Sequence, residues 1–150
     1  SDGAQQPAHA LHDALDRRGV REAHPVRRAE RRAGHHRDVV VVERVTCVHD
    51  CGFAIDPDTV VAQMEGGILF GLGALVQSVE VVDGAPVPAN FDGFPVPRLP
   101  QMPRIDVHLL DSGAAPGGVG EAGTAAILPA VANAVFAATG RRIRRLPIGE

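Results

Sequence analysis

Four glycines surround a single carboxylate in the stretch Pro116-Gly117-Gly118-Val119-Gly120-Glu121-Ala122-Gly123-Thr124. Residues without a Cβ let the backbone approach a ligand closely and turn its N–H groups toward that ligand. The nearest basic residues on the N-terminal side are Arg104 and His108, so a surface ion pair is a poor explanation for the acid. The stretch therefore predicts a tight loop before a helix, and it indicates that Glu121 takes part in chemistry.

The same loop formally matches G-x-G-x-x-G, the pattern of a dinucleotide-binding turn, from Gly118 to Gly123. That fold places the first glycine directly after a strand and an acid about twenty residues later. Here seven residues separate Leu110 from Gly118, and no acid lies between Glu121 and Glu150. A carboxylate inside the turn would also repel a pyrophosphate. We therefore set the dinucleotide interpretation aside.

Apolar periodicity predicts two helices in a single domain of 150 residues. The first begins with Asp56 as N-cap and Pro57 at the first helical position, and its apolar stripe consists of Val61, Met64, Ile68, Leu72 and Leu75. The second spans 124–139, ends at Gly140, and its apolar face consists of Ile127, Val131, Val135 and Phe136. Glycines at 66, 67, 71 and 73 in the first helix indicate close approach of a ligand or another backbone, or helix packing through small residues.

Short strands complete the expected fold. Residues 38–48 and 104–110 predict two strands, and 78–87 predicts a hairpin around Asp83-Gly84. The proline-rich stretch 91–102 is expected to run extended, and 141–147 to form a last short strand. Together these segments predict an α+β domain at 39–150, with two Gly-bearing helices packed on short mixed strands.

The first 38 residues differ in composition, since they are rich in Arg and His and poor in large apolar residues. We favour a solvated, disordered arm over an anion-binding patch. The overall net charge of −3 argues against nucleic-acid binding. No uninterrupted apolar run is long enough to cross a bilayer. No signal peptide is visible at the start, which leaves the cytoplasm and the periplasm open as compartments.

Cysteine and histidine cluster at one place, in Cys47, His49, Asp50 and Cys51. A zinc site normally needs a second Cys or His pair at a suitable spacing, and the sequence offers none. In a strand the two thiols would also lie too far apart for a disulfide. We therefore expect buried or free thiols and assign no metal ligands.

The order of several motifs carries a family resemblance over about residues 39–148. These motifs are Cys51-Gly52-Phe53-Ala54-Ile55-Asp56-Pro57, Gln63-Met64-Glu65-Gly66-Gly67-Ile68, Gly71-Leu72, Asn90-Phe91, Pro103-Arg104-Ile105-Asp106-Val107-His108, Gly117-Gly118-Val119-Gly120-Glu121, Pro129-Ala130-Val131-Ala132-Asn133-Ala134, and the closing stretch 142–147. This order resembles the C-terminal part of the molybdopterin-binding large subunit of the xanthine dehydrogenase/aldehyde oxidase family. Within that family it is most similar to the isoquinoline 1-oxidoreductase β-subunit.

The resemblance implies a role for named residues. Glu121 matches the catalytic base of the family's glycine loop, and a dehydrated pocket would make such a carboxylate a better base. Gln63 matches the residue that hydrogen-bonds the cofactor, and an amide both donates and accepts. Gly118, Val119 and Gly120 are expected backbone contacts to the cofactor. Where the family usually has prolines after the Glu, this chain has Ala122, Ala125 and Ala126.

The resemblance also implies cofactors and partners. It implies a molybdenum–pterin cofactor, with the cytosine dinucleotide form as one option, and iron–sulfur clusters on a small partner subunit. The expected reaction is the oxidation of an N-heterocycle or aldehyde with oxygen from water. Because the large subunit is several times longer than this chain, the chain is expected to be inactive without the remainder of that subunit.

Two other functions remain open on the sequence alone. The chain could be an inactive remnant that folds without cofactor. It could also be an unrelated α+β module that binds anions through its arginines. Neither alternative requires a special role for Glu121, so a change at that residue distinguishes both from the leading hypothesis.

Overall fold

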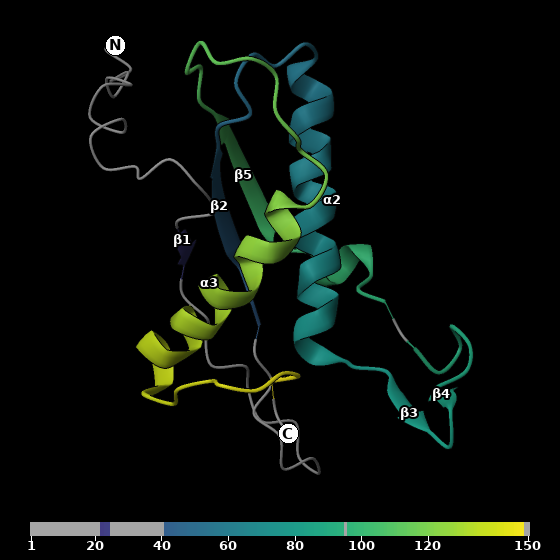
Figure 1. Ribbon diagram of the computed structural model, residues 1–150. Helices are drawn as coiled ribbons and strands as arrows, with labels where there is room; N and C mark the ends of the chain where they lie inside the picture. The colour runs from purple at the N-terminus through teal and green to yellow at the C-terminus, as the bar shows by residue number, and fades with distance from the viewer. Residues whose placement is uncertain (1–21, 25–40, 95, 149–150) are drawn as a thin grey trace.

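The computed structural model describes residues 22–24, 41–94 and 96–148 (Figure 1). Its elements are the strands β1 (Glu22–His24), β2 (Arg44–His49), β3 (Glu80–Val82), β4 (Ala85–Val87) and β5 (Arg104–Leu109), the helices α2 (Pro57–Val76) and α3 (Ala122–Thr139), and the 3-10 helix η1 (Leu99–Gln101). Apart from β1, the predicted arm at 1–38 lies outside the described residues. The α+β class with two glycine-bearing helices and short mixed strands is confirmed.

The main sheet has the strand order β1-β2-β5. β1 is antiparallel to β2, whereas β2 and β5 are parallel and stay in register from Arg44 opposite Arg104 to His49 opposite Leu109. Two like charges therefore lie across from each other at the start of this pair. The Asp106 carboxylate compensates both charges, because it forms ion pairs with Arg44 at 2.9 Å and with Arg104 at 3.0 Å.

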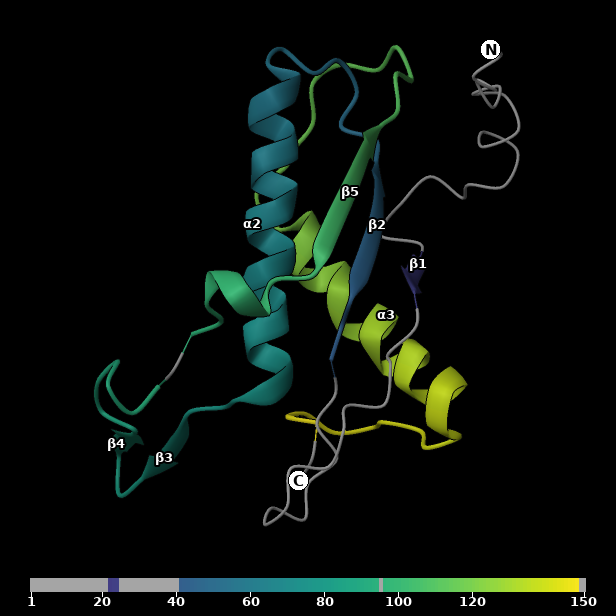
Figure 2. The same ribbon diagram turned by 180° about the vertical axis from the view of Figure 1, so that it is seen from behind.

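The core forms between one face of the sheet and the two long helices, which Figures 1 and 2 show from opposite sides. Alternation along β2 directs Val45 and Cys47 into this core, and their partners in register, Ile105 and Val107 of β5, are partly buried beside them. The helices supply the remaining fully buried side chains: Met64, Ile68, Leu75, Ile127, Val131 and Val135.

β2 is shorter than the predicted strand at 38–48, since the regular ladder begins at Arg44. Its parallel partner β5 begins only at Arg104, whose N–H donates to the Glu43 carbonyl at 3.0 Å. Val41 precedes this ladder and is 43% exposed. The strand predicted over 38–48 is therefore not formed at residues 41–43, because the ladder with β5 begins at Arg44.

α2 begins as predicted. The Asp56 side chain accepts a hydrogen bond from the Thr59 N–H at 3.3 Å and another from the Thr59 hydroxyl at 2.7 Å, with Pro57 in the first turn. The buried stripe is partly different from the predicted one and consists of Val60, Met64, Ile68, Gly71 and Leu75. Val60 and Gly71 are buried in addition to the predicted positions, whereas Val61 and Leu72 are half-buried, and Leu72 packs against the core.

α3 begins at Ala122, two residues before the predicted start, and ends at Gly140 in the left-handed conformation with φ 73°. Three of the four predicted apolar positions are buried: Ile127, Val131 and Val135. Phe136 is instead 37% exposed, and the Arg142 guanidinium stacks 3.9 Å from its ring centre.

The glycines of α2 let its backbone approach α3 closely. A Cβ on Gly71 would clash with the Ile127 side chain and lie 2.9 Å from the Thr124 carbonyl oxygen. A Cβ on Gly123 would lie 2.8 Å from the Met64 carbonyl oxygen. The Thr124 hydroxyl donates to the Gly67 carbonyl at 2.9 Å in the same contact. Of the two interpretations left open by the sequence, these positions support helix packing through small residues.

Both long helices have a length and composition that would allow a membrane crossing, with 20 residues in α2 and 18 in α3. This differs from the expectation drawn from uninterrupted apolar runs, because small residues link the large apolar ones in both helices. The helices pack against each other through their glycines and contribute jointly to the core, as the core helices of a folded domain do. Length and composition alone are weak grounds for a membrane span.

The hairpin β3–β4 is confirmed, with Asp83 at φ 51° and Gly84 at φ 81° in its two-residue turn. Two other predictions for irregular segments are wrong. The stretch 91–102 is not extended throughout, because it contains turns at 91–94 and the 3-10 helix η1. The stretch 141–147 forms no strand, since its chain crosses back to α2, where the Ile148 N–H donates to the Leu75 carbonyl at 2.7 Å.

Candidate functional site

Two loops meet where the parallel strands β2 and β5 end. Asp50 joins them, because its Oδ1 accepts from the Gly52 N–H at 2.9 Å and from the Ser112 hydroxyl at 2.7 Å. The carboxyl end of a parallel strand pair is a common position for ligand sites in α/β sheets. This role of Asp50 is not evident from the sequence, since Ser112 lies 62 residues away along the chain.

Backbone hydrogen bonds fasten the glycine loop to the loop after β2. The Phe53 N–H donates to the Ala114 carbonyl at 2.9 Å, and the Gly117 N–H donates to the Cys51 carbonyl at 2.7 Å. Gly52 has φ +67°, and a Cβ there would lie 2.7 Å from the Ala114 carbonyl oxygen. A glycine is therefore required at position 52 for these two loops to meet.

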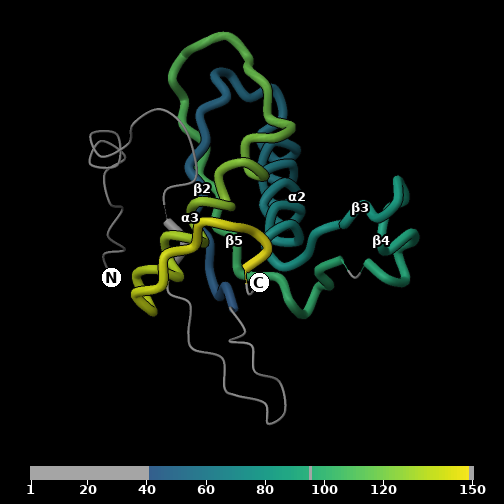
Figure 3. Tube along the Cα trace, turned by 60° about the horizontal axis from the view of Figure 1, so that its bottom comes forward, coloured from purple at the N-terminus to yellow at the C-terminus, as the bar shows by residue number. Residues whose placement is uncertain are grey.

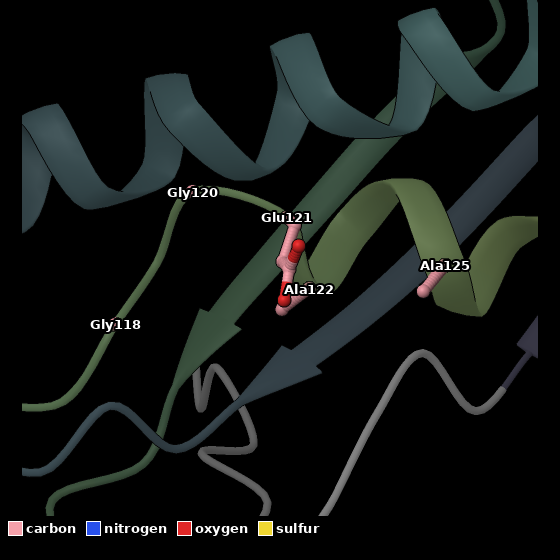
Figure 4. A pocket seen from close by; sticks show the side chains of 5 residues that line it. All are labelled: Gly118, Gly120, Glu121, Ala122 and Ala125. Carbon is pink, nitrogen blue, oxygen red and sulfur yellow. The ribbon is translucent and has the colours of Figure 1, made fainter.

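A pocket of about 650 Å³ lies beyond this fastened part of the loop, and its lining residues are Gly118, Gly120, Glu121, Ala122 and Ala125. Figure 4 shows the loop passing Gly118 and Gly120 before it enters α3 at Glu121, with the Glu121 side chain next to Ala122. A Cβ on either lining glycine would meet nothing within 4 Å, so open space lies beside the backbone there.

Glu121 occupies the N-cap position of α3. Its carbonyl accepts the first helical hydrogen bond, from the Ala125 N–H at 3.2 Å, whereas its side chain makes no capping hydrogen bond. The carboxylate is exposed and forms no hydrogen bond or ion pair with any residue that the structure describes. A simple capping role therefore does not account for this acid, and its oxygens are available at the pocket.

The other predicted site residues lie in different surroundings. Val119 is half-buried, packs against the core and is not among the residues that line the pocket. The packing of Val119 against the core anchors the loop at the position between Gly118 and Gly120. Gln63 is exposed on α2 and is not among the residues that line the pocket. The structure thus brings Gly118, Gly120 and Glu121 together and leaves Gln63 outside that group.

The cysteine and histidine cluster is mainly buried. Cys47 and Cys51 are both buried and free, and burial raises the pKa of the Cys47 thiol to about 11. His49 is 9% exposed, and its Nε2 has no hydrogen-bond partner within the described part of the chain. Burial lowers the pKa of His49, and the nearby Asp50 charge acts in the opposite direction. In residues 22–24, 41–94 and 96–148, no three His, Cys, Asp or Glu side chains are grouped to hold a metal ion.

Comparisons with known proteins point to one family. A model of the molybdopterin cofactor-binding domain matches residues 36–103. The chain is 44% identical over 108 residues to the isoquinoline 1-oxidoreductase subunit beta of Brevundimonas diminuta. This match covers 71% of this chain and 14% of the relative. It is 39% identical over 111 residues to the membrane-bound aldehyde dehydrogenase [pyrroloquinoline-quinone] of Gluconacetobacter polyoxogenes, and this match covers 73% of this chain and 14% of that relative.

A solved structure agrees with these relatives. Quinoline 2-oxidoreductase from Pseudomonas putida 86 superposes with a TM-score of 0.66 at 26% identity, covering 75% of this chain and 16% of that one. The chain therefore spans about a seventh of the length of the relatives it matches. From the sequence matches and the shared fold, we conclude that the chain belongs to the molybdopterin-binding family of the xanthine dehydrogenases and aldehyde oxidases.

Proposed function

We propose that the chain forms part of the cofactor site of a molybdenum hydroxylase, with Glu121 as the general base. The expected reaction is the oxidation of an aldehyde or an N-heterocycle with oxygen from water. The observation that carries the proposal is the state of the Glu121 carboxylate. It makes no capping hydrogen bond and no ion pair with a described residue, and it lies beside a pocket lined by glycine. No hydrogen bond or ion pair with a described residue occupies its oxygens.

The pocket fits a bulky, oxygen-rich group such as a molybdenum–pterin cofactor. Open space lies beside Gly118 and Gly120, and the N–H groups from Gly118 to Gly120 donate to no other described residue. The first N–H groups of α3 lie next to them, and a helix N-terminus favours negative charge. These donors would hold cofactor or substrate oxygens, and Gln63 would contribute an amide from α2 if the assembled enzyme brings it near.

When bound, the cofactor supplies the redox chemistry and the oxygen that is transferred. The task of Glu121 is to take up a proton on its carboxylate during that transfer. Its present exposure would weaken this action, because water competes for the carboxylate. We therefore propose that the remaining polypeptide covers the pocket and excludes water, and that this chain is inactive alone. Iron–sulfur clusters on a partner subunit would receive the electrons, and the pterin would be of the molybdopterin or cytosine dinucleotide form.

Replacement of Glu121 by Gln tests the proposal in the assembled enzyme. Glu121→Gln preserves the size of the side chain but removes its basicity. We expect the rate of oxidation of an aldehyde or an N-heterocycle such as isoquinoline to fall by about 10²- to 10⁴-fold. Metal analysis is expected to show unchanged molybdenum content, because the backbone donors of the loop remain.

Asp58→Asn is the matched control, since Asp58 is an exposed acid in the first turn of the other long helix. It should leave both the rate and the molybdenum content unchanged. A Glu121→Gln enzyme that turns over at the wild-type rate would refute the role of Glu121 as base. Loss of molybdenum in that variant would instead indicate a binding role.

A further inference from the structure

The β3–β4 hairpin stands away from the main sheet and from both long helices, as Figures 1 and 3 show in two orientations. All six of its strand residues are exposed. Val81 is 72% exposed, and Val82 and Val87 are 50% and 51% exposed. A two-stranded hairpin is marginally stable in water without packing against another element. This hairpin finds no such element within the described residues.

Both faces of the hairpin carry apolar side chains. Val81 pairs with Pro86, and these two side chains share one face, while Val82 and Ala85 share the other face with Glu80 and Val87. An antiparallel sheet that lies on a folded domain usually has one apolar face and one polar face. Apolar residues on both faces indicate that the hairpin is enclosed on both sides by protein that is not part of this structure.

The exposed apolar surface continues on either side of the hairpin. Val76 at the end of α2 is 61% exposed, and Phe91 and Leu99 beyond the hairpin are each 81% exposed. We call residues 76–94 and 96–101 the hairpin arm. A hydrogen bond from the Gln77 side chain to the Gly93 carbonyl at 3.4 Å joins the segments before and after the hairpin. Several large apolar side chains exposed within one segment are typical of an interaction site.

Charge and chain length identify the occupant. The hairpin arm carries three acids, Glu80, Asp83 and Asp92, against one base, Arg98. In a two-fold dimer built on this arm, the same acidic patch would face its own copy. The relatives, by contrast, have about six-sevenths of their length beyond the part that matches this chain. That polypeptide is large enough to enclose both faces of a hairpin.

We propose that the hairpin arm is the docking surface for the remaining part of the molybdenum-binding polypeptide, which grips both faces of the hairpin with an apolar groove bordered by basic residues. The proposal rests on the proposed function only in that the chain works as one part of a larger cofactor-binding subunit. It does not depend on the role of Glu121, which lies in a different part of the fold.

A binding experiment tests this docking surface. The probe is the isoquinoline 1-oxidoreductase subunit beta of Brevundimonas diminuta without the stretch that matches this chain. The full chain is titrated into it, and Kd is measured by calorimetry. Val81→Asp and Val87→Asp should each weaken binding roughly tenfold or more, because a carboxylate is then buried in an apolar interface. Val81→Ile should bind like the wild type.

Val41→Asp is the matched control, since it introduces the same charge at an exposed valine outside the hairpin arm. It should bind like the wild type. Because Val81 and Val87 are already exposed, their variants should also keep the wild-type urea midpoint, which excludes misfolding as the cause. Glu121→Gln should retain full binding. Failure of the general-base hypothesis and failure of the docking hypothesis therefore give different results.

Three outcomes would overturn the proposal. The first is no binding by the wild-type chain. The second is equal Kd values for Val81→Asp and the wild type. The third is a dimer of the chain alone that Val81→Asp dissociates, which would assign the surface to a second copy.

Discussion

His49 is the residue whose environment most clearly couples the fold to pH. Its imidazole is buried at the end of β2, and burial lowers its pKa despite the nearby Asp50. The unfolded chain therefore binds a proton more readily than the folded chain does. The stabilising contribution of neutral His49 is complete above its ordinary pKa of about 6.5 and is lost as the pH falls below that value.

This linkage gives a prediction at the residue scale. The wild-type free energy of unfolding should decrease between about pH 8 and pH 5, and His49→Leu should lack that part of the decrease because Leu does not titrate. Urea denaturation at a series of pH values measures both. Parallel pH profiles for the two proteins would show that other groups cause the dependence.

Single residues also show where sequence reasoning ends. The isolation of Glu121 from basic residues is evident in the sequence, but its N-cap position is not, because α3 begins two residues before the predicted start at 124. The link from Asp50 to Ser112 was not evident, because it depends on which strands pair in space. Whether Gln63 and Glu121 act on one cofactor also depends on polypeptide outside this chain.

At the scale of elements, the contact between α2 and α3 depends on missing side chains. Gly66 and Gly71 lie on the same helix, yet a Cβ on Gly66 would meet nothing within 4 Å, while one on Gly71 would clash with Ile127. Gly66→Ala should therefore raise the free energy of unfolding by about 0.5–1 kcal/mol through helix propensity. Gly71→Ala should lower it by about 1–3 kcal/mol through overpacking.

Urea denaturation followed by circular dichroism measures both variants under the same conditions. Because the two changes are chemically identical, their opposite signs would isolate the effect of the helix contact. If Gly71→Ala were as stable as Gly66→Ala, the close approach of the two helices would be refuted.

The elements themselves were predicted unequally, for a physical reason. Caps and turns are local signals, so Asp56, the Asp83-Gly84 turn and Gly140 all mark the predicted boundaries. Burial is a tertiary property. The sequence pattern placed Phe136 in the core, but the structure leaves it against Arg142 instead.

At the scale of the whole molecule, the C-terminal segment connects the far end of α2 with α3. Ile143 and Ile148 pack against the core, and the Ile148 N–H binds the Leu75 carbonyl at 2.7 Å. A chain that ends after Gly140 should lose about 2 kcal/mol in free energy of unfolding, since two partly buried Ile side chains contribute about 1 kcal/mol each.

Thermal and urea denaturation of the shortened chain check this expectation. A chain that lacks only residues 149–150 serves as control and should unfold like the full chain. Unchanged stability after removal of 141–150 would show that this segment merely covers the core without supporting it.

The parallel pairing of β2 with β5 also sets an order of events during protein synthesis. β2 is translated before its partner β5, which follows more than fifty residues later, and α3 is translated later still. Until α3 is translated, the glycines of α2 lack the helix against which they pack. The pocket beside Glu121 therefore forms only after β2, α2 and β5 have been translated, because α3 supplies part of its lining.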